Sequence, residues 1–193
     1  MNPPSFPTLE TERLHLREIT LDDAPALFAI HGDPEVMRWF GADPLAQPAD
    51  AERLVKLFAS WRDLPNPGVR WGLQAKADGE LIGTVGLFAW NRGWSTCTLG
   101  YELARRAQGQ GLMQEALRAT LDWGFREMKL HRISAQIHPD NEASLRSVRK
   151  LGFVEEGLLR EIGYWGGRFH DLMQYSLLST EFEHRAAPLN CAP

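Results

Sequence analysis

The sequence is short of cysteine and has no long apolar run. Its 193 residues include two cysteines, Cys97 and Cys191, whose wide separation fits neither a disulfide framework nor a metal-binding pair. No apolar stretch is long enough to span a membrane, and the first residues lack the charged-then-apolar pattern of a signal peptide. These absences predict a cytoplasmic protein with no metal and no membrane partner.

Positive charge is also in the minority. The net charge of −4 argues against a general nucleic-acid-binding protein. Within this total, residues 104–150 carry 9 Lys/Arg against 5 Asp/Glu, whereas the segments before and after them are both net acidic. This basic block favours a ligand that carries several phosphates, although a solvated helix face is the alternative.

What is present fits an ordinary globular domain, with 44% hydrophobic and 24% charged residues. Apolar alternation predicts strands at residues 11–19, 70–76, 81–88, 95–103, 132–137, 153–164 and 170–178. Helical spacing predicts helices from residue 21, at 36–40, at 48–61, from 112 to 129 and at 141–151. We therefore predict an α+β fold, with a mixed, mostly antiparallel sheet of about six or seven strands flanked by helices. One domain should cover residues 1–180, followed by a flexible tail at 181–193.

The most informative stretch runs from Gly100 to Ala116. It begins as an apolar strand, turns at Gly109 and Gly111, and continues as an amphipathic helix. The first N–H groups of a helix have no partner within it and lie at the positive end of its dipole, so they bind anions. Glycine permits positive φ and lets a ligand approach the backbone closely. The turn therefore indicates a phosphate site, with a ligand-free strand-to-helix turn as the alternative.

Two familiar phosphate motifs do not fit this turn. A Walker loop requires Gly-Lys-Ser/Thr, whereas Gly111 is followed by Leu112 and Met113. A dinucleotide fingerprint requires a third glycine near Gln114 and an acidic residue after the next strand, and neither is present. The ligand is therefore expected to be of another kind.

A third motif fits. The segment Gln108–Met113 resembles the Gln/Arg-x-x-Gly-x-Gly/Ala signature of the GCN5-related N-acetyltransferase (GNAT) superfamily, although Met113 replaces the usual small last residue. Other segments follow in the order and spacing of that family: Arg13–Arg17, Asn141–Ser144, Lys150–Phe153, Glu156–Leu158 and Asp171–Tyr175. Together they resemble the RimJ/RimL branch, whose founding members acetylate the N-termini of ribosomal proteins. The resemblance covers residues 9–180.

The resemblance implies the GNAT fold, with two central strands splayed apart at an acetyl-CoA site and no metal. The strand Tyr101–Ala104, including Leu103, would pair its backbone with the pantetheine arm, to which Asn141 would also bond. The pyrophosphate would lie on the backbone amides of the turn: Gln108, Gly109, Gln110, Gly111, Leu112 and Met113. A role as helix N-cap is an equally good interpretation of Asn141.

Acetyl transfer requires an unprotonated amine and a proton for the leaving thiolate. Many members of the superfamily supply that proton from a tyrosine at the position of Val148, so this route is closed here. In the RimL-like branch the acid is a serine, which corresponds to Ser144, and the base is a carboxylate, which corresponds to Glu156. Glu102 is the rival base, because other branches use a carboxylate on that strand. A first-turn helix serine and a surface carboxylate are the structural alternatives for Ser144 and Glu156.

The acceptor is predicted to be a primary amine, most favourably a protein or peptide N-terminal α-amine. An α-amino group has a pKa of about 7.7–8.0 and a lysine amine about 10.4, so one carboxylate serves the first more readily. Trp39 and Tyr164 are expected to wall the acceptor pocket. The alternatives are a small-molecule amine (polyamine, amino acid or antibiotic) and a non-catalytic acyl-CoA-binding module. Family members often pair, so a homodimer is also expected.

The histidines are not expected to act in catalysis. His131, His138 and His170 are scattered along the chain without metal-ligand spacing, which favours structural roles.

Overall fold

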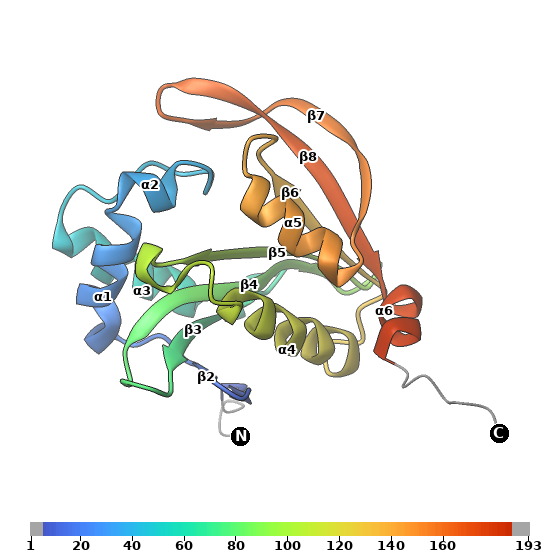
Figure 1. Cartoon of the computed structure of the whole chain (residues 1–193), viewed down its shortest axis with the longest axis horizontal. Helices are drawn as coiled ribbons and strands as arrows, with labels where there is room; N and C mark the ends of the chain where they lie inside the picture. Colours follow the sequence, from blue (N-terminus) through green and yellow to red (C-terminus); the bar gives the residue numbers. More distant parts are fainter. Residues whose placement is uncertain (1–5, 187–193) are drawn as a thin grey trace.

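The computed structural model describes residues 6–186, which fold around one central sheet (Figure 1). The strands are β1 (Leu9–Glu10), β2 (Leu14–Arg17), β3 (Val69–Ala75), β4 (Leu81–Asn91), β5 (Thr96–Leu103), β6 (Arg132–Ile137), β7 (Val154–Trp165) and β8 (Arg168–Leu178). The α-helices are α1 (Ala24–His31), α2 (Pro34–Met37), α3 (Pro48–Ser60), α4 (Leu112–Arg126), α5 (Glu142–Leu151) and α6 (Ser179–Ala186). Short 3₁₀ turns are η1 (Leu21–Asp23), η2 (Trp61–Asp63) and η3 (Arg105–Ala107).

The sheet has eight strands in the order β1-β2-β3-β4-β5-β6-β8-β7. All neighbours pair antiparallel except β5 and β6, so the predicted mixed, mostly antiparallel sheet is confirmed. The sheet has one strand more than the seven predicted because β1 lies before the segment at 11–19, which contains only β2. A turn in which the Thr11 N–H donates to the Leu14 carbonyl joins the two strands.

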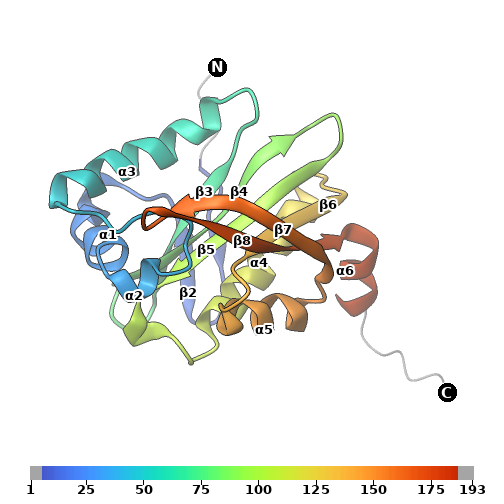
Figure 2. The ribbon, with the colours of Figure 1, turned by 90° about the horizontal axis from the view of Figure 1, so that it is seen from above.

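Helices cover both faces of the sheet. Figure 2 shows α1 and α3 on one side and α4 and α5 on the other. On the α4 side, Leu117, Leu121 and Phe125 pack into the main core with strand residues such as Leu87. A second cluster joins Leu27 of α1 to Val55 and Phe58 of α3. The apolar spacing of each helix therefore places one face against the sheet, as amphipathic helices require.

The parallel pair β5–β6 comes apart along its length. Pairing runs only from Thr96↔Arg132 to Thr98↔Ser134, and neither strand pairs with the other beyond that point. Leu99–Leu103 and Ala135–Ile137 therefore continue as separate strands with a gap between them. This gap is the splay that the sequence resemblance implied, and it leaves backbone groups of both strands available to a ligand.

The long β7–β8 hairpin extends from the sheet toward α2 (Figure 1). At its tip, Trp165 Nε1 donates to the Arg38 carbonyl at 3.2 Å, and the Gly166 N–H donates to Asp43 Oδ1 at 2.7 Å. The hairpin is therefore joined to the segment that follows α2, on the other side of the gap.

The predicted tail begins too early in the chain. Residues 179–186 form α6, and Phe182 packs against Phe125 of α4 with ring centroids 5.1 Å apart. The helix follows β8 directly because an aromatic side chain in this segment has a place on the core. The remaining tail residues, with Pro188, Cys191 and Pro193, lie outside the described residues.

Candidate active site

The turn before α4 has the geometry of an anion site. Gly109 and Gly111 both adopt left-handed backbone, with φ of +75° and +78°, and Gly111 is the N-cap of α4. No side chain within residues 6–186 caps this helix end, so its first N–H groups are left for a ligand. Arg13 braces the turn by donating Nη1 to the Gln110 carbonyl at 2.9 Å and Nε to Glu115 at 2.7 Å. Glycine is needed at both positions because other residues are strained there.

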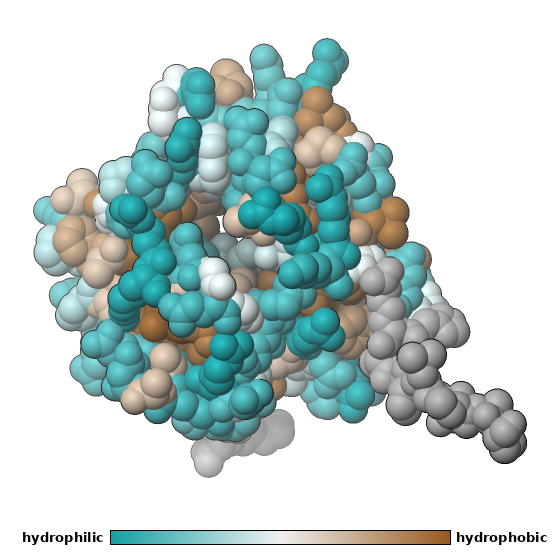
Figure 3. All heavy atoms as spheres, viewed as in Figure 1, coloured by the Kyte–Doolittle hydropathy of each residue, from teal (hydrophilic) through white to brown (hydrophobic). Residues whose placement is uncertain are grey.

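A cavity of about 500 Å³ leads away from this turn, which is within the size range of ligand sites. It runs from the turn to the start of α5, and Figure 3 shows a hollow on this face bordered largely by hydrophilic side chains. Its walls include these predicted site residues: Trp39, Glu102, Leu103, Gln108, Gly109, Met113, Asn141 and Ser144. The structure thus brings together residues that lie up to about a hundred positions apart in the chain.

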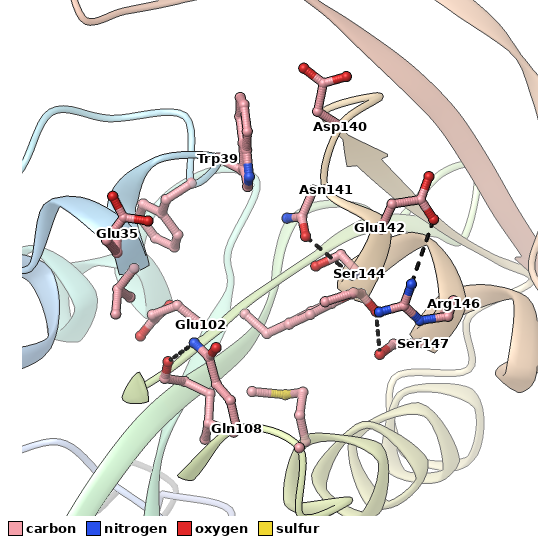
Figure 4. A pocket seen from close by; sticks show the side chains of 17 residues that line it. Glu35, Trp39, Glu102, Gln108, Asp140, Asn141, Glu142, Ser144, Arg146 and Ser147 are labelled. Atoms are coloured by element: carbon pink, nitrogen blue, oxygen red, sulfur yellow. Dashed lines mark hydrogen bonds and ion pairs between the residues drawn. The ribbon is translucent and has the colours of Figure 1, made fainter. Parts of the chain in front are cut away.

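A smaller cavity of about 130 Å³ occupies the gap between β5 and β6. It is lined by Leu99 and Gly100 of β5, by Ala135 and Gln136 of β6, and by Arg70 of β3, among others. The residues that line both cavities are Trp39, Phe40, Tyr101, Asn141 and Ser144. The two spaces therefore meet at these residues, around the start of α5 (Figure 4).

The sequence predicted a backbone role for Tyr101 but gave no role to its side chain. Its hydroxyl is buried and has no hydrogen-bond partner among the described residues. Burial raises the pKa of this phenol to about 12, and the nearby Ser144 side chain lowers that pKa by a smaller amount. A buried hydroxyl without a partner costs about 1–3 kcal/mol, so it is retained where a ligand can use it. Its place in the Gly-Tyr strand before the turn was visible in the sequence, but its missing partner was not.

Asn141 and Ser144 lie at the first turn of α5. The Asn141 Oδ1 accepts a hydrogen bond from the Ser144 N–H at 3.2 Å, so the predicted N-cap role is confirmed. The Asn141 side-chain nitrogen points the other way, toward Trp39 across the cavity (Figure 4). Capping and ligand binding are compatible, because the two ends of one amide serve them separately.

Glu102 is buried in an ion pair, facing away from Tyr101 as its neighbour on a strand should. Its carboxylate accepts from Arg70 Nη2, from the Thr84 hydroxyl at 2.5 Å and from His31 Nε2 at 3.1 Å. Burial alone would raise the pKa of Glu102, but the charge of Arg70 and the contact with His31 lower it to about 2. A carboxylate this acidic is a weak general base, so its reach into the cavity suits binding more than proton abstraction.

Glu156, the predicted base, is not brought to the cavities. Both of its carboxylate oxygens are held by Arg132, with Nη1 donating to Oε1 at 2.7 Å, and Ser176 donates to Oε1 at 2.8 Å. Glu156 lines neither cavity, and its ion pair with Arg132 lowers its pKa. The shift in register between Glu155 and Gly157 places the side chain beside Arg132, at the end of β6 where β5 and β6 still pair.

Of the two predicted acceptor-pocket residues, the structure brings one to the site. Trp39 lines both cavities and stacks on His138 with ring centroids 4.1 Å apart. Tyr164 lines neither cavity, is 61% exposed, and packs against Phe169. Alternation along β7 turns Tyr164 outward and its neighbour Trp165 inward, so the inward aromatic is the next residue.

Two buried histidines, His138 and His170, stabilise the hairpin. His138 Nδ1 accepts from the Asp140 N–H at 3.1 Å, so its Nε2 carries the proton that points to His170 Nδ1 at 3.4 Å. His170 Nε2 then donates to the Trp165 carbonyl at 3.1 Å, and its ring stacks on the Trp165 ring. Burial lowers the pKa of His138. His138 and His170 are therefore structural, as expected, and residues 6–186 hold no cluster of ligands that could bind a metal.

Several predicted cofactor residues lie beside the larger cavity without lining it. The Ala104 N–H donates to the Ile82 carbonyl of β4 at 2.7 Å, so it faces away from the gap and is not free for a ligand. Alternation along the strand then directs the backbone of Leu103 and Tyr101 into the gap. Gln110, Gly111 and Leu112 are absent from the cavity wall, although they form the turn and the helix start.

Comparisons with known proteins agree with this geometry. The family model described as "Acetyltransferase (GNAT) domain" matches residues 13–154. The chain is 36% identical over 173 residues to the Bacillus subtilis N-acetyltransferase YoaA, itself described as uncharacterized, covering 90% of this chain and 97% of that protein. It is 32% identical over 113 residues to the Escherichia coli [ribosomal protein uS5]-alanine N-acetyltransferase, covering 58% of each.

Solved structures show the same fold. Mycobacterium smegmatis RimJ in complex with CoA-disulfide aligns with a TM-score of 0.81 at 22% identity, covering 90% of this chain and 88% of that one. Vibrio cholerae spermidine N-acetyltransferase, in complex with CoA and spermine, aligns with a TM-score of 0.76 at 23% identity, covering 88% and 98%. Within residues 6–186, no helix is both long and apolar enough to cross a membrane. The chain belongs to the GNAT acetyltransferase family and is an acetyl-CoA-dependent N-acetyltransferase.

Proposed function

We propose that this enzyme acetylates the α-amine of a peptide or protein N-terminus. The composition of the junction between the two cavities supports this proposal. The residues shared by both cavities supply hydroxyl, amide and aromatic groups but no carboxylate. An acetyl group held there would meet an amine at a point without a strong base.

The lack of a strong base favours an acceptor that loses its proton easily. At pH 7 the free-base form costs on the order of 1 kcal/mol for an α-amine and roughly 4.6 kcal/mol for a lysine side chain. Glu102 is held as an anion by Arg70, and Glu156 is held by Arg132 outside the cavities. Since neither carboxylate is placed to make up the larger cost, the α-amine is the better substrate.

Acetyl-CoA fits the residues that are present. The unpaired N–H groups at the start of α4 would hold the pyrophosphate, and the free edge of β5 with Asn141 would hold the pantetheine arm. The larger cavity connects these two places and ends at Tyr101 and Ser144. When bound there, the thioester supplies an activated acetyl group to the smaller cavity.

Tyr101 and Ser144 are the candidate proton donors. The C–N bond forms as the C–S bond breaks, so the departing sulfur gains one proton and the amine nitrogen loses one. The Tyr101 phenol, with its pKa of about 12, stays protonated at neutral pH, and its hydroxyl makes no hydrogen bond among the described residues. The Ser144 hydroxyl lies beside it at the same junction. A proton given to sulfur by either oxygen is replaced by the one that leaves nitrogen.

A matched pair of peptides tests the proposal. One peptide has a free N-terminus and no lysine, and the other has a blocked N-terminus and one lysine. Thiol release from acetyl-CoA and the mass of each peptide are measured together. We expect the free N-terminus to be acetylated at least tenfold faster in kcat/KM; equal turnover of the two peptides would contradict the proposal.

A polyamine acceptor is the second candidate, and the mouth of the larger cavity favours it. Glu35, Asp140 and Glu142 all line that cavity with well-exposed carboxylates. Glu35 and Glu142 are paired with Arg38 and Arg146, yet their exposed carboxylates and that of Asp140 still offer contacts to a cationic acceptor. Adding spermidine as a third acceptor to the same assay separates the two candidates.

A further inference from the structure

Arg70 lies across the sheet over a row of glycines. Arg70 of β3 is opposite Gly86 of β4, which in turn is opposite Gly100 of β5. A Cβ on Gly86 would come within 3.1 Å of the Arg70 side chain, and one on Gly100 would lie 3.8 Å from Arg70 Nη1. The two glycines therefore leave the space in which the arginine reaches from β3 to the gap beside β5.

The guanidinium is buried and only partly paired. Nε donates to the Thr84 hydroxyl at 2.7 Å, and Nη2 pairs with Glu102. The rings of Phe58, Phe40 and Trp61 surround it, with centroids 4.7, 5.6 and 5.8 Å from Cζ. The Arg70 side chain is 3% exposed. Buried guanidinium groups normally bond all of their N–H donors, because an unmet charged donor is costly.

Nη1 takes part in neither of these two bonds. Among the described residues it has no hydrogen-bond partner, and Arg70 lines the smaller cavity. Thr84 and Glu102 hold the other two nitrogens, so the guanidinium cannot turn Nη1 away from the cavity without breaking those bonds. This nitrogen presents fixed donors to whatever occupies the gap next to the junction.

We infer that Arg70 Nη1 binds the carbonyl oxygen of the acceptor's first residue, which makes Arg70 a specificity-determining residue for aminoacyl amines. This inference rests on the proposed function and narrows its substrate class. It identifies the acceptor as a compound whose amine is one carbon away from an amide carbonyl: a peptide N-terminus or an amino-acid amide. An amine without that carbonyl provides no hydrogen-bond acceptor for Nη1.

The charge of the cluster selects a neutral oxygen. Glu102 already neutralises Arg70, so a free carboxylate entering the gap would bury an anion with no cation left to pair with it. A second ammonium, as in a polyamine, would face the positive side of Arg70. An amide carbonyl accepts a charge-assisted hydrogen bond without adding charge, so it matches the site better than either.

The test compares alaninamide, free alanine and isopropylamine as acceptors in wild-type enzyme and in Arg70→Lys. Lysine keeps the charge for Glu102 but has no second terminal nitrogen and no planar fork. Arg132→Lys is the matched control, because Arg132 is paired outside both cavities. Taking the ratio of kcat/KM between variant and wild type for each acceptor cancels the different basicities of the amines.

We expect Arg70→Lys to lower kcat/KM for alaninamide by about 10- to 100-fold and for isopropylamine by less than about threefold. Wild-type enzyme should also prefer alaninamide to free alanine, and the control should change neither ratio. Equal losses for alaninamide and isopropylamine in Arg70→Lys would overturn the inference. If Arg70→Lys does not fold, the double variant Arg70→Gln/Glu102→Gln removes both charges together and should show the same selective loss.

The outcomes separate this inference from the proposed function. If wild-type enzyme acetylates free peptide N-termini and the Arg70→Lys ratios are unchanged, only the role of Arg70 is wrong. If wild-type enzyme acetylates spermidine and not alaninamide, the proposed function itself is wrong. Calorimetric affinity for CoA should be the same in wild type and Arg70→Lys, which shows that the cofactor site is intact.

Discussion

Arg132 holds both carboxylate oxygens of Glu156, on β6 and β7, away from the junction where Tyr101 and Ser144 meet. A carboxylate in this position stabilises the strand pair and does not contact the acceptor. We therefore predict that Glu156→Gln changes kcat/KM for acetyl transfer by less than about threefold, because a general base contributes about 10²–10⁴. The pH–rate profile should also match that of the wild type. A loss of a hundredfold or more at low pH, relieved at high pH, would restore Glu156 as the base.

Glu102 makes the stability of the fold dependent on acid. The pKa of Glu102 is about 2 in the folded protein, below its ordinary value of 4.5. The folded protein therefore binds this proton less tightly than the unfolded chain does. The resulting stabilisation, on the order of 3 kcal/mol, is present above pH 4.5 and is lost as the pH falls toward 2. Glu102→Gln should lower the unfolding free energy at pH 7 by about 3–5 kcal/mol, because it leaves Arg70 buried without its counter-ion. Denaturant titrations of both proteins at pH 7 and pH 3 should show the difference between them shrinking; a constant difference would contradict this account.

The glycine turn can be tested with one charge. Gly111→Asp puts a carboxylate at the N-cap of α4, where the pyrophosphate would lie, and should weaken acetyl-CoA binding by more than ~1.4 kcal/mol, or tenfold. Gly111→Asn is the matched control, because asparagine has the same size and both residues enter the left-handed region more readily than other side chains. Calorimetry should show a much smaller loss for the asparagine variant. Equal affinities in the two variants would remove the turn from the phosphate site.

Tyr101 and Ser144 can be tested by removing one oxygen at a time. Tyr101→Phe removes a hydroxyl that has no partner among the described residues, so it should leave stability unchanged or raise it while lowering kcat about 10- to 100-fold. Ser144→Ala keeps the backbone N–H that bonds Asn141, so the start of α5 should stay intact.

The kinetic pattern tells the two roles apart. A proton donor lowers kcat with little change in the KM for acetyl-CoA, whereas a binding residue raises that KM. We expect the kcat effect to be larger for Tyr101→Phe than for Ser144→Ala. If Tyr101→Phe is as active as wild type and Ser144→Ala is not, the acid is Ser144 alone.

Local signals in the sequence were sufficient for the fold, and for the glycine turn and the helix start at which we propose that the cofactor binds. Gly109 and Gly111 predicted a turn, and both adopt the left-handed backbone that this turn requires. Asn141 predicted the start of a helix, and its side chain caps α5. Each of these features depends on a few consecutive residues. The splay of β5 and β6 followed from the family resemblance and is confirmed by the register of the two strands.

The acceptor end depends on contacts that no short segment encodes. Arg70 of β3 reaches Glu102 of β5 across β4, where Gly86 leaves the space. Glu156 meets Arg132 next to a shift in the register of β7. Tyr164 and Trp165 differ by one position on a strand, and only the packing of the hairpin tip on Arg38 shows which one faces inward. The acceptor itself, the homodimer and the cytoplasmic location stay predictions.

The preference for an α-amine can be measured on one peptide that carries both a free N-terminus and a lysine side chain. The peptide is incubated with acetyl-CoA and the enzyme at pH 7, and fragmentation by mass spectrometry locates the acetyl group. We predict a single acetyl group on the α-amine, formed at the same rate as free thiol, and little on the lysine. Acetylation of the lysine at a comparable rate, or no transfer to the peptide while spermidine is acetylated, would contradict it.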